Sequence, residues 1–509
     1  MEIISNIIKS AIEVGNKFQN SKPPAEAQQE VLKNLLRKAN KTAFGKFYGF
    51  KDLLKADNIV DAFQKEVPFH NYDQINERWW HKTYEGKSDI CWPGKPNYFA
   101  VSSGTTSSSK HIPVTDDMLE SIRLSGIHQI LSLSNFTDLP ETFYDKEILM
   151  LGSSTDLNEK EDHLEGEISG ISASNIPKWF NRFYKPGVEI SAIDDWDERV
   201  EEIAKNAHKW DIGSLSGIPS WIELMLQRVI EFNKLDTIHD IWPNLAVYTS
   251  GGVALDPYKK SFEQLFGKPV QYIDTYLASE GYLATQVRPD TDAMQLIYDN
   301  DIFFEFIPFT ADSISDDGEI SAEMEALTIE QVEENVDYIL IISTASGAWR
   351  YTIGDTVAFT NKENAEIKIT GRTKFFLNVV GSQLAVNKMD DAISAINNEF
   401  DINVKEFTVA AVKEDGEYIH HWYLGAENVR NDTDLEKITS FLDMHLQASN
   451  KNYKVARGKA LKNIKVDIIP VDVFFNWNDA NKKKGGQVKM AKVMKEDAFE
   501  EWEAFVDKA

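Results

Sequence analysis

The feature that most constrains the fold begins at Tyr98, where short β-rich runs start to alternate with amphipathic helical segments. The β-rich runs are YFAV, EILMLG, LAVYTSGG, VQYIDTYLA and YILIISTA, which begin at residues 98, 147, 245, 270 and 338. Between them, residues 116–134 and 220–235 carry apolar side chains at helical spacing. Strands that alternate with helices predict an α/β fold in which helices cover β-sheets. Functional groups are then expected in the loops at strand ends.

The regions before and after this alternation have a different pattern of predicted secondary structure. Residues 1–90 are predicted to be mainly helical, as in AEAQQEVLKNLLRKAN from Ala25. After EIKITGRTKFFLN the pattern restarts as a smaller α+β unit, with helices over 389–400 and 434–449 and a hairpin that turns near Asp415. We therefore predict a large N-terminal domain over 1–374 and a small, mobile C-terminal domain over 375–509.

Composition excludes several classes of protein. The 509 residues carry a net charge of -27, which opposes non-specific binding to nucleic acid. No stretch approaches eighteen consecutive apolar residues, so no membrane span is expected. The start of the chain lacks the features of a secretory signal, and the one cysteine, Cys91, fits a reducing compartment, so a cytoplasmic location is expected. His and Cys residues show no metal-site spacing.

The stretch SSGTTSSSK, from Ser102 to Lys110, is rich in hydroxyl groups. Ser109 stands where a P-loop needs glycine, so this is not the P-loop of kinases or GTPases. Gly104, the hydroxyl groups and Lys110 could still surround phosphate. By composition alone, a linker is as plausible as a phosphate site, but the apolar runs YFAV and HIPV on either side favour a loop held between two strands.

Four later segments contain groups that could join such a loop. In TYLASEGYLA, Glu280 could ligate Mg²⁺ and tyrosines could pack on a purine, although an ordinary surface turn is equally plausible. In WRYTIGDTVAF, Asp355 is predicted in a turn between two strands, where a carboxylate can accept both ribose hydroxyls. GRTKFFLNVVG places Arg372 at the predicted domain junction, and GQVKMAKV carries Lys489 and Lys492.

The order of these segments resembles that of adenylate-forming enzymes. The closer resemblance is to the plant auxin-responsive promoter (Gretchen Hagen) family, acyl-acid amido synthetases that join carboxylic acids to amino acids. It rests on SSGTT together with TAFGKFYGF from Thr42, SGIPSW from Ser216 and FFEFIP from Phe303, and it extends from about residue 42 to about 492. The resemblance implies a large adenylate-forming domain and a smaller α+β domain.

The resemblance also implies roles for individual residues. ATP phosphates would lie among Ser102, Ser103, Gly104, Thr105, Thr106 and Lys110. Tyr276 and Ser279 would lie near the adenine and the α-phosphate, Glu280 would help to hold Mg²⁺, and Asp355 and Arg372 would contact the ribose. The acyl site would be lined by Ser216, Gly217, Ile218, Pro219, Ser250, Gly251 and Gly252.

The late lysine is where the sequence departs most clearly from the plant pattern. Lys489 occupies the position of the family's catalytic lysine, but Ala491 and Lys492 stand where the plant proteins have proline and arginine. Both Lys489 and Lys492 are therefore candidates. The phosphate loop also carries Ser107, Ser108 and Ser109 where a second glycine is common.

The activity that the resemblance implies is a ligase reaction with two halves. A carboxylate would attack the α-phosphorus of MgATP and release pyrophosphate, and an amine, an amino acid in this family, would then take the acyl group and release AMP. An acyl-CoA ligase shares the first half-reaction, and an inactive nucleotide-binding or scaffold protein is the alternative outside enzymes. The expected partners are a small carboxylic acid and an amino acid, and the expected state is a monomer or a weak homo-oligomer.

Overall fold

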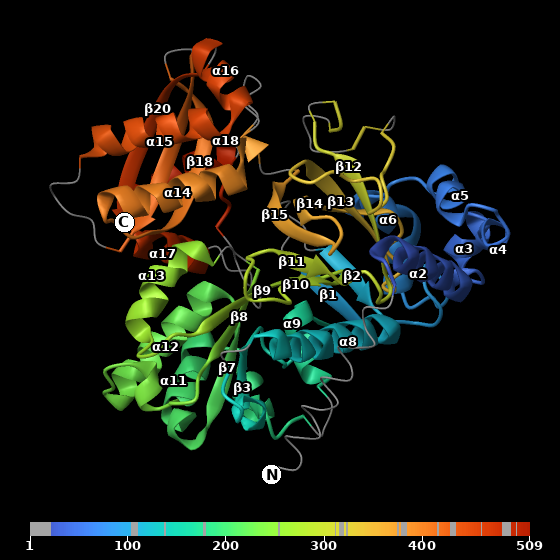
Figure 1. The fold of residues 1–509 in the computed structure, drawn as a ribbon, viewed down its shortest axis with the longest axis horizontal. Coiled ribbons are helices and arrows are strands. Elements are labelled where there is room, and N and C mark those ends of the chain that lie inside the picture. The colour runs from blue at the N-terminus through green and yellow to red at the C-terminus, as the bar shows by residue number, and fades with distance from the viewer. Residues whose placement is uncertain are drawn as a thin grey trace.

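The chain forms two units, each with its own hydrophobic core, in a computed structural model (Figure 1). The structure describes residues 22–102, 110–136, 139–176, 180–252, 255–310, 312–314, 320–321, 324–373, 376–377, 384–414, 417–427, 434–459, 461–480, 490–494 and 496–508. We refer to the described residues of 22–373 as the N-terminal body and to those of 384–508 as the C-terminal unit. The α/β class predicted from the sequence is confirmed.

Helices precede the first strand of the N-terminal body, as the sequence predicts for the described part of residues 1–90. They are α2 (Pro24–Ala39), α3 (Ala43–Phe47), α4 (Phe50–Leu53), α5 (Ile59–Glu66), α6 (Tyr72–Ile75), the π-helix η1 (Asn76–Trp80) and α7 (His81–Tyr84). Helix α2 begins with a proline in its first turn, where the missing N–H removes no helical hydrogen bond. Its buried Gln28 donates to the carbonyls of Tyr298 and Ile302, at 2.7 and 2.8 Å, and fixes α2 on the sheet.

Two sheets form the centre of the N-terminal body. The smaller has the order β2-β1-β5-β4, with β1 (Tyr98–Ser102), β2 (Lys110–Val114), β4 (Asn158–Glu159) and β5 (Leu164–Gly166). The larger has the order β12-β13-β14-β15-β11-β10-β9-β8-β7-β3-β6. Its strands are β3 (Glu147–Leu151), β6 (Tyr184–Lys185), β7 (Ile212–Gly217), β8 (Val247–Gly251), β9 (Gln271–Ala278), β10 (Gly281–Thr285), β11 (Met294–Leu296), β12 (Ile302–Pro308), β13 (Asp337–Thr344), β14 (Tyr351–Asn361) and β15 (Glu366–Arg372).

The larger sheet is parallel at one side and antiparallel at the other. Strands β9, β8, β7, β3 and β6 are parallel neighbours, whereas the pairs from β9 to β12 are antiparallel. The remaining helices of the body are η2 (Leu133–Asn135), η3 (Phe143–Asp145), η4 (Ala207–Lys209), η5 (Ile238–Asp240), α8 (Asp116–Ser132), α9 (Ile168–Ser174), α10 (Val188–Ser191), α11 (Trp196–Asn206), α12 (Pro219–Asn233) and α13 (Asp256–Leu265). Helices α12 and α13 contribute to the core beside β7 and β8.

The segment FFEFIP, which carries much of the family resemblance, has a structural role in β12. Glu305 is fully buried and pairs with Arg350, whose Nη2 lies 3.0 Å from its Oε1. The same guanidinium donates to the carbonyls of Gln64 and Val67, at 2.7 and 2.8 Å. Because both charged groups are paired and hydrogen-bonded, this motif fixes the sheet to the helical segment before it.

The C-terminal unit is built on the sheet β18-β19-β20. Its elements are β17 (Leu384–Ala385), α14 (Val386–Phe400), β18 (Val404–Glu414), β19 (Glu417–Ala426), α15 (Leu435–Ser449), α16 (Lys451–Lys459), β20 (Leu461–Pro470), α17 (Val471–Ala480) and α18 (Glu496–Val506). The predicted helices and the antiparallel pairing of β18 with β19 are confirmed, whereas the predicted turn at Asp415 lies outside the described residues. The short strand β16 (Phe376–Leu377) pairs with β17.

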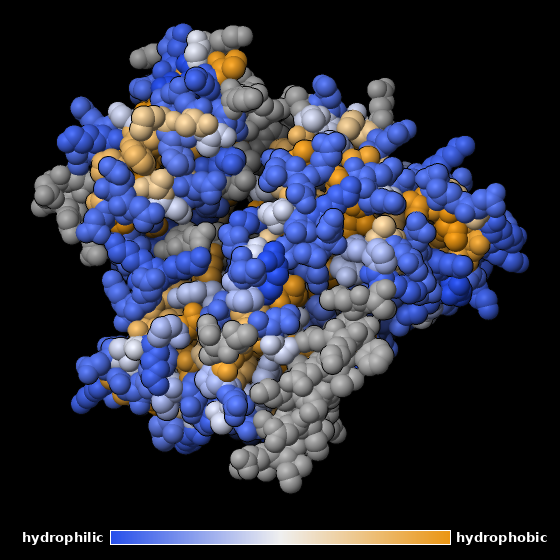
Figure 2. Space-filling view, in the orientation of Figure 1, coloured by the Kyte–Doolittle hydropathy of each residue, from blue (hydrophilic) through white to orange (hydrophobic). Residues whose placement is uncertain are grey.

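The C-terminal unit, orange to red in Figure 1, contacts α13 of the body through α14 and β18, and α14 also contacts β15. Figure 2 shows the molecule in the same orientation, with hydrophilic residues over most of the visible surface and hydrophobic ones in separate patches. Within the part of the chain that the structure describes, no helix has both the length and the apolar character that crossing a membrane requires.

Candidate functional site

The hydroxyl-rich stretch lies between two paired strands. Strands β1 and β2 are antiparallel, and Ser102 stands opposite Lys110 at the end of the ladder. This confirms the prediction that extended segments flank the loop on both sides. Ser103, Gly104, Thr105 and Thr106, as well as the serines at 107–109, lie outside the described residues. The Lys110 ammonium lies 5.5 Å from the ring centroid of Tyr72, whose hydroxyl accepts a hydrogen bond from the His111 amide at 2.9 Å.

A buried carboxylate on the neighbouring strand β5 supports this hairpin. Glu165 of β5 accepts a hydrogen bond from the Tyr84 hydroxyl at 2.6 Å, and the Nε2 atoms of His111 and His163 each lie 3.4 Å from the same oxygen. Burial raises the pKa of Glu165, but Tyr84, the nearby histidines and Lys160 together leave that pKa below its usual value. The carboxylate thus connects β5, α7 and β2 at the base of the loop.

Asp355 and Arg372 meet because β14 and β15 are neighbours in the larger sheet. The two residues are cross-strand partners, and Arg372 Nε lies 2.8 Å from Asp355 Oδ1. The Tyr276 hydroxyl, from β9, donates to Oδ2 of the same carboxylate. Burial and the Asp355 charge raise the pKa of Tyr276 well above its ordinary value, so this tyrosine stays a donor. A carboxylate has about four acceptor positions, so Asp355 can still accept further hydroxyl groups.

The prediction that Asp355 lies in a turn between two strands is wrong. Strand β14 is continuous from Tyr351 to Asn361, and Gly354, at φ +90°, lies within it. Ile341 pairs with Thr352 and Ile339 with Thr356, so β14 carries extra residues between these pairs. Such a bulge lets a strand redirect a side chain without ending the sheet, which explains the turn-like sequence.

Glu280 occupies the turn between β9 and β10, as the sequence predicts, together with Ser279. Burial raises the pKa of the Glu280 carboxyl to about 7, with Lys110 opposing this rise and Asp355 adding to it. The Tyr351 hydroxyl is a hydrogen-bond partner of Glu280. Since the charges of Lys110 and Asp355 both act on the pKa of Glu280, these three separately predicted groups lie near one another.

The donor set at Glu280 fits a magnesium ion that is held mainly by a substrate. Among the described residues, no group of three or more His, Cys, Asp and Glu side chains is arranged to hold a metal ion. Mg²⁺ in nucleotide sites commonly takes one or two carboxylates and completes its coordination with phosphate oxygens and water. A single buried carboxylate beside Lys110 meets that requirement.

The residues predicted to line an acyl site lie at the carboxyl ends of parallel strands. Ser216 and Gly217 end β7, Ser250 and Gly251 end β8, and Gly217 is the register partner of Ser250. A Cβ atom at Gly251 would lie 2.8 Å from Thr275 Oγ1, so the close approach of β9 requires glycine there. Ile218, Pro219 and Gly252 follow directly, and α12 begins at Pro219. Open α/β sheets bind ligands at such strand ends.

Of the two late lysines, the structure describes Lys492, and that side chain is engaged away from this cluster. Lys489 lies outside the described residues. Lys492 belongs to the C-terminal unit, where its ammonium lies 2.9 Å from Glu406 Oε2 and 4.4 Å from the ring centroid of Phe407. The structure therefore shows a cation of the C-terminal unit engaged on its own strand β18.

Sequence reasoning missed the side chains that orient the predicted groups. Tyr351 lies in the quoted segment WRYTIGDTVAF, but its contact with Glu280 depends on the strand order of the larger sheet. Gln129 of α8 was also missed, although it donates to Thr249 at 2.9 Å and accepts from Tyr282 at 3.0 Å. No local signal in the sequence distinguishes such partners from ordinary polar residues.

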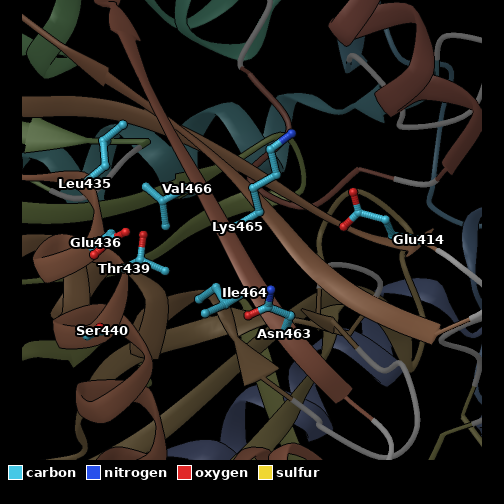
Figure 3. A pocket seen from close by; sticks show the side chains of 9 residues that line it. All are labelled: Glu414, Leu435, Glu436, Thr439, Ser440, Asn463, Ile464, Lys465 and Val466. Carbon is cyan, nitrogen blue, oxygen red and sulfur yellow. The ribbon is translucent and has the colours of Figure 1, made fainter.

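A groove in the C-terminal unit is separate from this site (Figure 3). It has a volume of about 430 Å³ and lies between the start of α15 and β20, and its lining includes Glu414, Glu436 and Lys465. None of the predicted site residues lines it.

Comparison with protein families gives matches along most of the chain. The N-terminal domain of the GH3 family matches residues 16–201, the central domain matches residues 295–372 and the C-terminal domain matches residues 385–498.

Curated relatives are more distant. An indole-3-acetic acid-amido synthetase of Arabidopsis thaliana is 24% identical over 272 residues, which cover 50% of this chain and 45% of that protein. A jasmonoyl–L-amino acid synthetase of Oryza sativa subsp. japonica is 27% identical over 233 residues, which cover 42% of this chain and 39% of that protein. The chain thus spans less than half the length of these two relatives in the matched regions.

Solved structures share the fold over nearly the whole chain. The GH3.15 acyl acid amido synthetase has a TM-score of 0.78 at 15% identity, with 98% of this chain and 96% of that chain covered. A 2-hydroxyisobutyryl-CoA ligase in its postadenylation state has a TM-score of 0.59 at 13% identity, with 95% and 92% covered. At these identities the likeness shows a common fold.

Proposed function

The chain belongs to the GH3 family, and on this premise we propose that it is an ATP-dependent acyl-acid amido synthetase. It would adenylate a small carboxylic acid and transfer the acyl group to an amine. The amine that we propose is an amino acid, which the name of one relative, a jasmonoyl–L-amino acid synthetase, includes. The observation that carries the proposal is the convergence of Lys110, Glu280, Asp355, Tyr276 and Arg372 in one site.

In the first half-reaction, the acid's carboxylate attacks the α-phosphorus of ATP and pyrophosphate leaves. Asp355, fixed by Tyr276 and Arg372, would accept the two ribose hydroxyls. Lys110 and the loop after Ser102 would bind the β- and γ-phosphates, which lowers the charge of the leaving group. Ser279 would contact the α-phosphate beside Tyr276.

Glu280 would hold Mg²⁺, which neutralises phosphate charge when bound. Its carboxyl is buried and its pKa is raised to about 7, so a cation that favours the ionised form would lower that pKa. The acid substrate would lie at the strand ends that carry Ser216, Gly217, Ile218, Pro219, Ser250, Gly251 and Gly252.

In the second half-reaction, the amine attacks the acyl carbonyl, giving the amide and AMP. A C-terminal domain that begins near residues 374–375 would rotate between the two halves and exchange active-site contacts. Lys489 or Lys492 would stabilise the α-phosphate during adenylation. The remaining expectations are a cytoplasmic monomer or weak homo-oligomer that binds its two small substrates and no nucleic acid.

The test measures the two halves separately. Purified protein with MgATP and a panel of carboxylic acids should catalyse acid-dependent ATP–pyrophosphate exchange, and added amino acids should yield amide and AMP. Lys110→Ala should weaken ATP use, with Lys87→Ala, an exposed lysine of the same body, as the matched control.

Two other outcomes would each indicate an alternative function. Turnover with CoA and no amide would indicate an acyl-CoA ligase, whose first half-reaction is the same. Absence of exchange with every acid would support an inactive nucleotide-binding or scaffold protein.

A further inference from the structure

The contact between the two units contains a buried lysine. Lys405 of β18 is only 4% exposed, and its ammonium is bonded to Glu223 of α12, which is also 4% exposed. Ser261 of α13 lies 3.4 Å from the same ammonium, and Glu427, on the lysine's own unit, supplies a second carboxylate. The ammonium is therefore enclosed by groups from both units.

Neighbouring Glu406 makes a second contact across the same boundary. The hydroxyl of Tyr258, from α13, donates to Glu406 Oε1 at 3.0 Å. The other oxygen of Glu406 accepts from Lys492 at 2.9 Å. One carboxylate thus joins the N-terminal body to a candidate catalytic lysine.

A β-bulge explains how consecutive residues can face the same helices. Val404 pairs with Ala426 and Glu406 with Gly425, which leaves Lys405 as an extra residue on β18. Successive side chains of a regular strand point to opposite faces, whereas a bulge redirects them. The irregularity lets Lys405 and Glu406 both reach α12 and α13.

The backbone fixes the segment of Lys492 on the same strand. The Val409 amide donates to the Lys492 carbonyl at 3.0 Å, and the Met494 amide donates to the Val409 carbonyl at 2.9 Å. The short segment 490–494 is therefore attached to β18, and the Lys492 side chain extends along this strand to Glu406.

The contacts that these groups make across the boundary are ion pairs and hydrogen bonds. Among the groups, only Tyr258 also belongs to an apolar core, the one around α12, and it reaches Glu406 through its hydroxyl. Away from the body, Lys405 would keep Glu427 and regain water. Removing one partner of a buried ion pair leaves the other charge uncompensated, so loss of either partner would favour separation of the two units.

We infer that Glu223, Tyr258, Ser261, Lys405 and Glu406 form an interdomain latch, which holds the C-terminal unit on α12 and α13 while Glu406 retains Lys492. The link to catalysis rests on the proposed function. Opening the latch removes Tyr258 from Glu406 and frees the unit that carries Lys492 to move, so the latch sets the balance between orientations used by the two half-reactions.

The first test measures orientation in the full-length protein without substrates. Spin labels at Asp197→Cys on α11 and Met444→Cys on α15, both exposed positions, report the distance between the units, and the native Cys91 is buried. Lys405→Met should move at least half of the population out of the main distance peak. Tyr258→Phe, a milder change, should move a smaller fraction in the same direction.

Matched variants separate the latch from a general loss of charge. Lys260→Met removes the ion pair with Asp401 at the exposed edge of the same contact, and it should leave the peak unchanged. Adding Glu223→Gln to Lys405→Met removes the uncompensated carboxylate and should restore part of the docked population. An unchanged distance distribution in folded Lys405→Met would overturn the inference.

The second test compares the half-reactions. Lys405→Met should lower amide formation from added acyl-adenylate at least fivefold relative to ATP–pyrophosphate exchange, because the latched state withholds Lys492 from the nucleotide. Equal changes in both rates would contradict the coupling to catalysis. Absence of both activities in the unaltered protein would instead reject the proposed function, and the distance measurement would still decide whether the latch exists.

Discussion

Two buried ion pairs in this protein have different consequences. Glu305 and Arg350 lie within the N-terminal body, where adjacent backbone carbonyls complete the hydrogen bonds of the guanidinium. Lys405 and Glu223 belong to different units, so the two side chains separate when the units move apart. Breaking the first pair leaves a charge with no route to water, whereas breaking the second allows the units to move apart. The first therefore stabilises the fold, and the second controls orientation.

The comparison is tested most strongly by Arg350→Met. The substitution leaves the Glu305 carboxylate buried without its cation, and the free energy of unfolding of the N-terminal body should fall by about 3–5 kcal/mol. Hydrogen–deuterium exchange in increasing urea reports the stability of each unit. Lys405→Met should change the free energy of unfolding of either unit by less than about 1 kcal/mol, because separation of the units returns the Glu223 carboxylate to water. Equal losses in the two variants would remove the distinction.

Glu280 tests whether a buried carboxyl group within the N-terminal body makes the stability of the protein depend on pH. Its pKa is raised to about 7 from 4.5, so the folded state binds more protons than the unfolded state between these values. The stabilisation that this group provides is full below pH 4.5 and is lost as the pH rises through about 7. Relative to the unaltered protein, Glu280→Gln should therefore gain about 3 kcal/mol in unfolding free energy between pH 4.5 and pH 8.

The measurement is urea unfolding at a series of pH values. Glu77→Gln, at an exposed position of the same body, serves as the control and should show no such pH dependence. A flat difference between Glu280→Gln and the unaltered protein would show that the carboxyl is hydrated.

Asp355→Asn sharpens the comparison at the proposed nucleotide site. The amide keeps the shape but loses the charge that Arg372 and Tyr276 hold in place, so kcat/KM for ATP should fall about 100-fold. ATP–pyrophosphate exchange measures this, and Glu363→Gln, in the exposed turn after β14, should match the unaltered protein. A change below threefold would argue against ribose binding by Asp355.

The smallest expected effect is that of Glu165→Gln, on β5 beside the β1–β2 hairpin. The amide retains one acceptor for Tyr84 but weakens the attraction to His111 and Lys160, so KM for ATP should rise about fivefold, which corresponds to about 1 kcal/mol, while kcat stays within twofold. Steady-state kinetics distinguish the two constants. Glu159→Gln on the exposed strand β4 is the control, and an equal effect there would exclude a specific role for Glu165.

Much of the fold was accessible from the sequence because its signals are local. The β-rich runs from Tyr98 and the helical periodicity over 116–134 and 220–235 correspond to β1, α8 and α12 and to the other strands quoted. Gly354 shows the limit. A glycine followed by aspartate is typical of turns, yet the pairing of β14 with β13 and β15 carries the strand through this point as a bulge.

The sequence by itself determined which residues end strands and which chemical groups follow them: Lys110 after a hydroxyl-rich stretch, Glu280 after β9, and glycines at the ends of β7 and β8. The tertiary structure alone decided which of these groups meet. Asp355 contacts Tyr276 and Arg372, and Lys405 contacts Glu223, through strand order, register and the docking of two units. Such pairings join residues far apart in the chain, and their strength depends on burial, which local sequence does not specify.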